Sequence, residues 1–502
     1  VLNYGVRYDF FGDISTTGPW SVWRPGASGT DANGLIQVGT PGAPPTYKPG
    51  KLHFSPRVGF AYNPVDKLAI RGSYGLYFDS APFNGFGNNS VSFATGSNAT
   101  GLQANPFGGV GNVSLSVGQW QTNQPVFSGA ALASTYGLFS VDPNLKMAYA
   151  HDFNLATELQ VNKKTVFTLA YAGSVGVHLY SLLDTNQAAP WSTSAPGNTN
   201  GPGGTATATN LCNQPNNGAN ANCLLQRRPS LLNKSITNYN KVGAVVEVAS
   251  NGASNYHSLQ ATLKASGYHG LTGQLAWTLG HTLDNGSGFR STGPTNSNNL
   301  RVDYGNASFD IRHTLSGYVV YEVPQIGHRF AALTKGWQGT AFVKFNTSGP
   351  FSITVGDNTG IGMNKDRVSY TGANLKTGSK TIQTNPTTGV KFIQYWNAAA
   401  AGKVLYNPDP SGTYGIQGNT ARDQFRGPHF FDIDSALVKN TKIYEGVNLQ
   451  FRADLFNLFN IVNPGNPATS ITGSTFGQQT SAPTGISSGA PFNVQFAGKI
   501  IF

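Results

Sequence analysis

The sequence predicts an all-β fold, a transmembrane antiparallel β-barrel with long loops at one end. Four observations support this prediction. Charged residues make up only 11% of the chain, whereas soluble proteins contain about 25%. Apolar and polar residues alternate with a period of two along many segments. These segments are about 11–13 residues long, as a tilted membrane strand requires, whereas soluble strands are usually about 5–6 residues long. The segments are joined alternately by short turns and by long polar loops.

The composition excludes several other classes of protein. Aromatic residues make up 12% of the chain and the mean hydropathy is -0.23, so the chain does not have the low aromatic content that is typical of disorder. No apolar run approaches the roughly 20 residues of a transmembrane helix. A closed β-structure is therefore the expected way to cross a membrane, because every backbone amide must find a hydrogen-bond partner there.

The formal net charge of +11 has two interpretations. Lysine and arginine residues scattered over turns produce such a charge without any function. A barrel interior biased toward anionic solutes produces it as well. The sequence has no run of lysine and arginine of the kind that binds nucleic acid, so nucleic acid is not a predicted partner.

Roughly fourteen segments show the alternating pattern. The clearest is 447–459, in which Leu449 and Phe451 lie on one face while Arg452 and Asp454 lie on the other. In chain order, the segments lie near residues 1–11, 52–63, 68–80, 90–96, 149–162, 165–176, 236–250, 253–267, 271–284, 311–323, 337–355, 429–440, 447–460 and 491–502.

The connections between these segments differ strongly in length. Residues 63–67 and 162–164 form tight turns, whereas 177–235, 285–308 and 356–428 are long stretches rich in Gly, Ser, Asn and Pro. Short turns on the periplasmic side and long loops on the extracellular side are typical of outer-membrane barrels. Structureless loops of this length argue against a compact soluble domain.

The register of one hairpin follows from its apolar pattern. Pairing Leu263 with Leu275 keeps the apolar side chains of both segments on one face and leaves a three-residue loop, Tyr268–Gly270. The same register places His257 opposite His281. Such a pair could bind a metal weakly or sense pH. Alternatively, both residues are amphipathic side chains at the level of the lipid headgroups, as Tyr and Trp often are.

Several segments resemble Oar-like TonB-dependent receptors, and they occur in the same order as in those proteins. They are 54–62, 70–79, 255–260, 310–313, 451–460 and 496–502. The resemblance implies that residues 1–502 are the C-terminal portion of a barrel of about 22 strands, with the plug domain and an N-terminal regulatory-like domain absent from this chain. It also implies that the barrel-assembly machinery reads the terminal strand through Phe496, Ile500 and Phe502.

The resemblance also implies two possible roles for charged side chains that point into the barrel. These side chains contact the plug, or those near Arg57 and Arg71 guide an anionic solute. The apolar alternation places the following residues inside: Arg57, Arg71, Asp79, Asp152, Glu158, Arg312, Glu322, Lys344, Asp432, Asp434, Arg452 and Asp454.

The long loops contain further candidate residues. In receptors of this type the solute is contacted largely by loops and plug, so Trp191, Tyr395 and Trp396 are candidates for stacking on a sugar or a siderophore. The two cysteines, Cys212 and Cys223, lie in one polar loop. A local disulfide there fits an oxidising compartment and would contribute roughly 3 kcal/mol.

The sequence gives little indication of catalysis. Residues 485–489 match the nucleophile-elbow string but lack the strand–turn–helix context that this motif needs. Asp432 and Asp434 could be read as paired catalytic carboxylates, although a hydrated barrel wall explains them as well. No metal, phosphate or dinucleotide motif is present. We therefore expect no catalytic residue, metal or cofactor, and a protein that is not an enzyme.

Two functions remain. The first is a receptor of the Gram-negative outer membrane that imports a scarce large solute, namely a siderophore, a carbohydrate or a peptide. Its partners would be outer-membrane lipid, the barrel-assembly machinery, the solute and, through a plug, the TonB energy-coupling complex. The second is a secreted or surface-attached all-β adhesin or glycan-binding protein. Burial decides between them, because only a soluble protein hides the apolar face that carries Leu449 and Val319.

Overall fold

The structure is a computed structural model. It describes residues 1–12, 21–23, 35–37, 50–80, 117–118, 126–127, 136–142, 144–188, 242–288, 294–325, 334–356, 365–378, 381–396, 405–406, 417–479 and 491–502. Among these residues, no helix has both the length and the apolar character that crossing a membrane requires.

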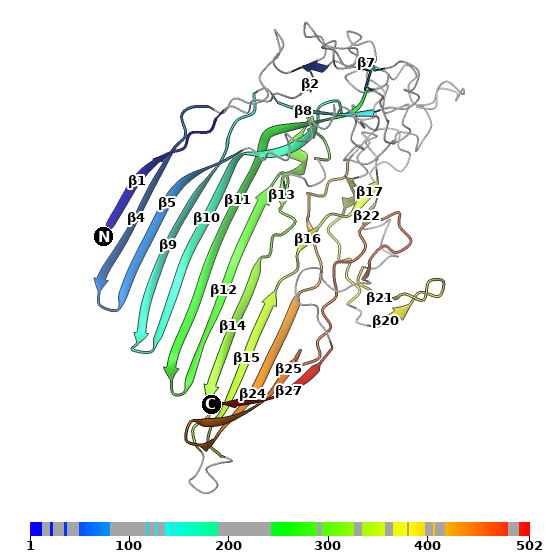
Figure 1. Ribbon diagram of the computed structural model, residues 1–502. Helices are drawn as coiled ribbons and strands as arrows, with labels where there is room; N and C mark the ends of the chain where they lie inside the picture. The colour runs from blue at the N-terminus through cyan, green and yellow to red at the C-terminus, as the bar shows by residue number, and fades with distance from the viewer. Residues whose placement is uncertain are drawn as a thin grey trace.

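One large sheet of 14 strands dominates the fold (Figure 1). Its main path is antiparallel, and each strand pairs with the next one in that path. In order, the strands are β1 (Leu2–Tyr8), β4 (Phe54–Val65), β5 (Leu68–Asp79), β9 (Ala148–Asn162), β10 (Thr165–Asp184), β11 (Val242–Tyr268), β12 (Leu271–Asp284), β14 (His313–Glu322), β15 (Trp337–Asn346), β24 (Phe430–Tyr444), β25 (Val447–Phe456) and β27 (Asn493–Ile501).

Shorter strands lie in the connections. Strand β8 (Tyr136–Val141) pairs in parallel with β11, and β13 (Gly305–Asn306) follows the 3-10 helix η3 (Leu300–Asp303) and pairs with β12. The small separate sheets are β2 (Ser21–Trp23) with β3 (Leu35–Gln37), β6 (Val117–Gly118) with β7 (Val126–Phe127), β16 (Pro350–Phe351) with β23 (Phe425–Arg426), β17 (Thr354–Gly356) with β18 (Asp366–Arg367), β19 (Ser369–Tyr370) with β22 (Leu405–Tyr406), and β20 (Ile382–Thr384) with β21 (Lys391–Gln394) and β26 (Gln478–Gln479).

Tight turns and long connections lie at opposite ends of the large sheet (Figure 1), as the sequence predicts. The pairs β4–β5, β9–β10, β11–β12 and β24–β25 are joined by tight turns. Residues 323–336 form a longer link at the same end, between β14 and β15. We call this end the turn end and the other end the loop end.

The β11–β12 hairpin confirms the predicted register and corrects its turn. Leu263 pairs with Leu275 and His257 with His281. The loop has two residues instead of three, because Tyr268 pairs with Leu271. His269 and Gly270 both have positive φ, 48° and 81°, as a type I′ turn requires. A bulge between Ala265 and Tyr268 absorbs the extra residue.

Four other predicted segments differ from the structure or lie partly or wholly outside the described residues. Residues 242–250 and the segment 253–267 belong to a single strand, the 27-residue β11, while 236–241 lie outside the described residues. Segment 337–355 ends as a strand at Asn346, a few residues before Pro350, which has no amide to donate to a sheet. Segment 90–96 lies outside the described residues.

The large sheet has one apolar and one polar face. Residues directly opposite each other in an antiparallel pair point to the same side, so the register assigns each side chain to a face. Tyr4, Val58, Tyr74 and Phe153 form one continuous cross-strand row of the apolar face. In the described structure this face is not covered, and Leu449, for example, is 39% exposed.

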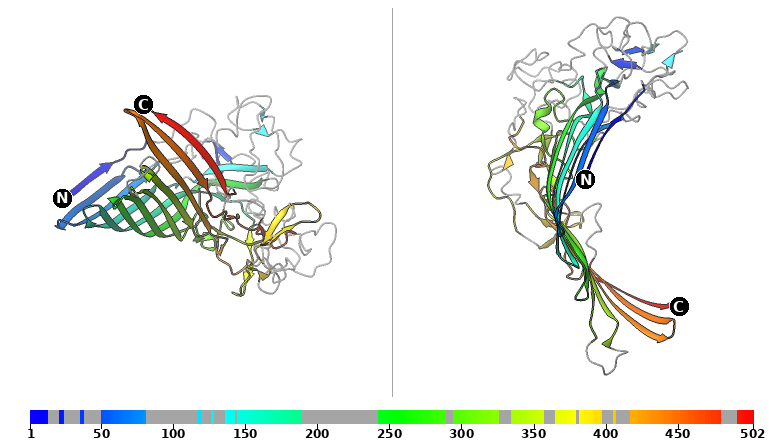
Figure 2. Two further views of the ribbon diagram at one scale, coloured as in Figure 1. Left: turned by 90° about the horizontal axis from the view of Figure 1, so that it is seen from below. Right: turned by 90° about the vertical axis from the view of Figure 1, so that its left-hand side faces the viewer.

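The sheet is twisted and curved, and it is open in the described part of the chain (Figure 2). Strands β1 and β27 lie at its two edges. An open sheet with this alternation corresponds to part of a barrel wall, as predicted for a partial barrel.

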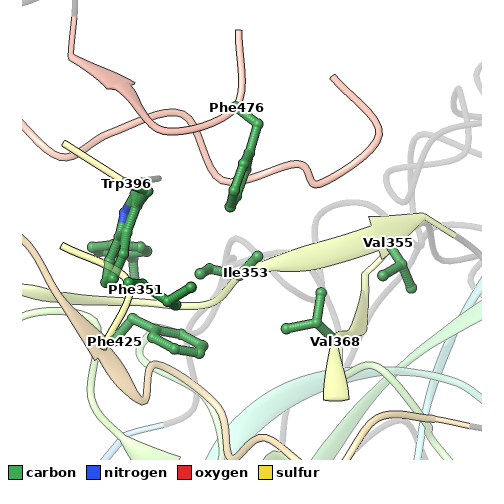
Figure 3. Packing of buried hydrophobic residues seen from close by; sticks show 8 residues of the cluster. Phe351, Ile353, Val355, Val368, Trp396, Phe425 and Phe476 are labelled. Carbon is green, nitrogen blue, oxygen red and sulfur yellow. The ribbon is translucent and has the colours of Figure 1, made fainter. Parts of the chain in front are cut away.

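An apolar core lies in the connections and not between two sheet layers (Figure 3). It is built by the described residues of the β15–β24 connection (347–429) and of the β25–β27 connection (457–492), which we call the loop assembly. Its buried members are Phe351, Ile353, Val355, Val368, Leu375, Trp396, Phe425 and Phe476.

Candidate functional site

The polar face of the sheet contains the first candidate site. The register places the predicted inward-pointing residues of the strands on this one face, for example Arg57 opposite Gly75, which in turn lies opposite Asp152. Lys344 lies directly opposite Asp432. That these residues contact a plug or a solute remains a prediction.

Several charges on the polar face already have partners within the sheet. The Arg57 guanidinium lies 4.5 Å from the centre of the Tyr77 ring, an attractive cation–π contact. Arg71 and Glu158 form an ion pair with an N–O distance of 2.5 Å. Arg71 therefore has a carboxylate partner within the sheet, whereas the guanidinium of Arg57 faces an aromatic ring.

The same face carries aromatic residues that the sequence analysis did not single out. Tyr318 and Phe342 lie opposite each other with ring centres 6.3 Å apart, and Phe342 is 55% exposed. Lys344 lies over the ring of Phe430. An aromatic and a charged residue, Phe342 and Lys344, thus follow each other on the polar face of β15, a surface that can bind both hydroxyl-rich and aromatic groups.

Nearer the loop end, other predicted residues bond to their own neighbours. The Asp434 carboxylate accepts a hydrogen bond from the backbone amide of Asn457 at 2.8 Å, and Arg452 pairs with Asp454 at 2.6 Å. Asp152 accepts a hydrogen bond from Ser174 at 2.6 Å. These contacts fix the carboxylates before any partner binds.

The loop end contains a second candidate site, built on three buried ion pairs. Asp284 lies at the end of β12, and Asp303 and Asp310 lie in the β12–β14 connection. Each of these aspartates pairs with an arginine of the loop assembly. The pairs are Asp284 with Arg422, Asp303 with Arg367, and Asp310 with Arg426. All three aspartates are almost completely buried, so the loop assembly is held to the sheet by charge-assisted hydrogen bonds.

Asp310 is the centre of this arrangement. Its carboxylate accepts hydrogen bonds from the Thr282 amide, at 2.7 Å, and from Arg426, and it lies 3.3 Å from His281 Nδ1 and 3.5 Å from Arg312 Nε. Burial alone would raise the pKa of Asp310, but these donors outweigh it and hold the pKa below its usual value. The predicted inward residue Arg312 is therefore engaged by Asp310 and by His281, 3.1 Å away.

A cavity of about 260 Å³ lies beside the ion pairs. Three cations line it, Lys365, Arg367 and Arg422, together with two carboxylates, Asp303 and Asp423. Hydroxyl and amide side chains also line it, from Asn285, Ser287, Thr295, Ser308, Ser352 and Thr354, as do the apolar residues Leu182, Leu183, Pro294 and Leu300. The cavity therefore offers both hydrogen-bond donors and acceptors, with one more cation than anion.

The charges in the cavity respond to their burial. Burial lowers the pKa of Lys365 to about 8, against the opposing attraction of Asp303. Burial also raises the pKa of Asp423, although a hydrogen bond from Ser352 and the charge of Arg422 oppose this effect. Near pH 8 the Lys365 amine is thus partly neutral and can either donate to or accept from a bound group.

The loop assembly corrects one expectation of the sequence analysis. Trp396 is not an open stacking surface, because its side chain is only 4% exposed and its ring packs edge-on against Phe351 and Phe425. Figure 3 shows it inside the apolar cluster. Tyr395 is partly buried against the same cluster, and the Lys376 amine lies 5.7 Å from the centre of its ring. A stacking role for Tyr395 remains a prediction.

The remaining predicted residues lie at the last strand or outside the described residues. Phe496 and Ile500 lie on the exposed apolar face of β27, and Phe502 directly follows this strand. Their role as an assembly signal remains a prediction. Trp191, Cys212 and Cys223 lie outside the described residues. Within the described part of the chain, no group of three or more His, Cys, Asp or Glu residues could hold a metal ion.

Sequence reasoning missed the ion pairs and the cavity. The paired residues are 138, 64 and 116 positions apart, so no local spacing reveals them. The one available signal was that Asp284 lies at the end of the predicted strand 271–284 and Asp310 directly before the predicted strand 311–323. An acidic residue that is buried at such a place needs a cationic partner.

The fold and its two faces define a class, the transmembrane β-barrels with short turns at one end and long loops at the other. The family described as Outer membrane beta barrel domain matches residues 1–495. The chain belongs to this family, and it is located in the bacterial outer membrane.

Solved structures similar to the chain include the outer membrane transporter YddB of Escherichia coli, with 9% identity and a TM-score of 0.43 over 89% of this chain and 40% of that one. They also include the ferric-catecholate import receptor Fiu of E. coli K12, with 9% identity and a TM-score of 0.35 over 96% of this chain and 40% of that one. The chain thus spans well under two thirds of these proteins. No curated protein matches it.

Proposed function

We propose that the chain forms the barrel wall of a TonB-dependent receptor that imports a scarce large solute: a siderophore, a carbohydrate or a peptide. The observation that carries this proposal is the folded loop assembly, with its cavity, at the loop end of a membrane-spanning sheet. The sheet also has a polar inner face, which an import pathway needs and an adhesion module does not. The family membership and the resemblance of segments such as 451–460 support the same proposal.

In this proposal the two candidate sites act in sequence. The cavity beside Lys365, Arg367 and Arg422 contacts an anionic or hydroxyl-rich group of the solute, because it combines cations with hydroxyl groups. The charges of the polar face then contact a plug domain, which links the barrel to the TonB complex. The protein binds and transports, and it catalyses no reaction.

The alternative of a soluble adhesin or glycan-binding protein has weaker support. Such a protein would bury its apolar residues, since large exposed apolar surfaces make a soluble chain aggregate. Here side chains such as Leu155 and Leu263 stay almost half exposed, 49% and 45%. The alternation therefore fits a surface that meets lipid.

Uptake by whole cells tests the proposal. Cells with and without the gene are given a radiolabelled ferric siderophore, an oligosaccharide and a peptide, each with and without a functional TonB. We expect deletion of the gene and loss of TonB to abolish uptake of the same probe. Unchanged uptake of all three probes after deletion, or uptake that needs the gene but not TonB, would contradict the proposal.

The role of the cavity is tested separately with two lysine variants. Lys365→Gln should weaken binding of the transported probe to cells, because the substitution removes a buried cation from the cavity. Lys376→Gln is the matched control, since Lys376 is an exposed residue of the same loop assembly that stacks on Tyr395. Equal binding by both variants would exclude the cavity as the solute site.

A further inference from the structure

Histidines gather on the apolar face of the sheet. His257 and His281 lie opposite each other on β11 and β12. His313 of β14 lies opposite Leu279, and His151 of β9 lies opposite Leu76 and Val175, so both point to the same side as the first two. Strands β9, β11, β12 and β14 thus each contribute a histidine to the lipid-facing surface, with β10 lying between β9 and β11.

The four histidines lie at a similar height above the turn end. Each is about 10–12 residues along its strand from the turn-end connection, which is the length that a tilted strand needs to span the hydrocarbon. The rows between them and the turns are apolar, for example Leu259, Ala261 and Leu263 below His257. The four residues, which we call the histidine belt, therefore lie at the loop-end boundary of an apolar band about 25 Å tall.

Neighbouring side chains orient the imidazoles. The Tyr74 hydroxyl lies 2.8 Å from Nδ1 of His151, and the Tyr171 hydroxyl lies 2.7 Å from Nδ1 of His257. When the tyrosine hydroxyl donates to Nδ1, Nε2 carries the proton and can donate to a group outside the protein. The ring of His313 stacks on Trp277 with centres 5.8 Å apart.

The groups that face the belt are mostly aromatic, and one further histidine, His178 of β10, packs edge-on against Tyr149, which also contacts His151. His151 contacts the rings of Tyr74 and Tyr149, and His257 contacts those of Tyr171 and Phe153. His281 differs, because Asp310 and Arg312 both contact it. His281 therefore lies beside the ion pairs of the loop end, whereas the contacts given for the other three are with aromatic rings.

We propose that the histidine belt binds the phosphate groups of outer-leaflet lipid headgroups, and that protonation of the imidazoles strengthens this binding in acidic medium. The unprotonated rings offer one N–H donor to a phosphate oxygen. Protonation adds a positive charge at the depth where the anionic phosphates lie. The belt thereby makes the affinity of the barrel for anionic lipid depend on the external pH. This dependence does not require any particular transported solute.

Lipid preference measured at two pH values tests this proposal. The full chain is reconstituted in phosphatidylcholine vesicles containing spin-labelled phosphatidylglycerol, whose phosphodiester keeps one charge over the range used. The relative association of phosphatidylglycerol over phosphatidylcholine is then measured by electron paramagnetic resonance. We expect it to rise about threefold or more between about pH 8 and about pH 5.5, since each interfacial charge attracts anionic lipid.

Variants separate the belt from other titrating groups. The triple variant His151→Gln, His257→Gln and His313→Gln should lose the pH dependence, and it leaves the contacts between His281 and Asp310 intact. His269→Gln, at the turn end, is the control and should behave like the unaltered chain. A pH-independent preference in the unaltered chain, or a rise that persists in a folded triple variant, would overturn the proposal.

Discussion

The large sheet and the loop assembly obtain their stability from different sources. The sheet exposes its apolar side chains, and its exposed ion pairs, such as Arg71 with Glu158, remain half in solvent. The loop assembly has its own buried core and buried ion pairs, such as Asp303 with Arg367. The comparison teaches that the loop assembly is organised like a small soluble domain, while the sheet depends on lipid to cover one face.

The largest expected effect is in the core of the loop assembly. Trp396→Ala should destabilise this assembly by about 3–5 kcal/mol, because it removes a buried aromatic ring from a packed cluster. Limited proteolysis should then cut within 347–429 many times faster. In gel electrophoresis the unheated variant should keep the mobility of the unheated, unaltered chain, because the sheet stays folded. A simultaneous change in that mobility would show that the two regions do not fold separately.

A comparable effect is expected at the centre of the ion pairs. Asp310→Asn leaves Arg426 without its anion and should cost about 3–5 kcal/mol. The folded pKa of Asp310 lies below the unfolded value of about 4. Its contribution to stability is therefore present above about pH 4 and is lost as the pH falls through the folded pKa.

Protease protection of the loop assembly, followed from neutral to acidic pH, measures this contribution. The unaltered chain should lose protection below about pH 4, while the variant should be less protected already at neutral pH. Equal protection of both chains at neutral pH would show that Asp310 does not hold the loop assembly in place.

Exchange of a lipid-facing residue for a charged one tests the sheet. Leu263→Arg should destabilise the folded protein in lipid by about 2–4 kcal/mol, because the guanidinium would lie in hydrocarbon. Thr262→Arg is the matched control, since Thr262 lies on the polar face one position away. Denaturant titration in vesicles compares the two, and equal losses would contradict the assignment of the faces.

The smallest effect is expected for the exposed pair on the polar face. Glu158→Gln should change stability by no more than about 1 kcal/mol, because Arg71 and Glu158 are both well exposed to solvent. The same titration measures it. A loss as large as that of Asp310→Asn would show that the polar face is buried against another part of the protein.

The sequence predicted the sheet well because membrane strands follow a local rule. Alternation with a period of two located most strands, and the Leu263–Leu275 pairing followed from keeping apolar residues on one face. The turn was wrong by one residue because a bulge, which the alternation does not reveal, shortened it. The polar-face residues were assigned by the same rule, and the register places those of the strands on one side.

The loop assembly was less predictable because its contacts are not local. Trp396 stands in a polar, glycine-rich stretch and therefore looked like an exposed binding residue. Its partners Phe351 and Phe425 are far away in the sequence, and only the folded connections bring them together. The same holds for Asp284 and Arg422, which are 138 positions apart.

The most direct test of the whole account is the environment of the apolar face. A spin label at Leu449, and another at Val319, should be accessible to oxygen and to lipid-soluble relaxing agents in vesicles, with little access for water-soluble ones. A label at Gln450, on the opposite face of the same strand, should show the reverse. Labels at Leu449 and Val319 that are shielded from lipid, as in a packed protein interior, would contradict the membrane-spanning barrel.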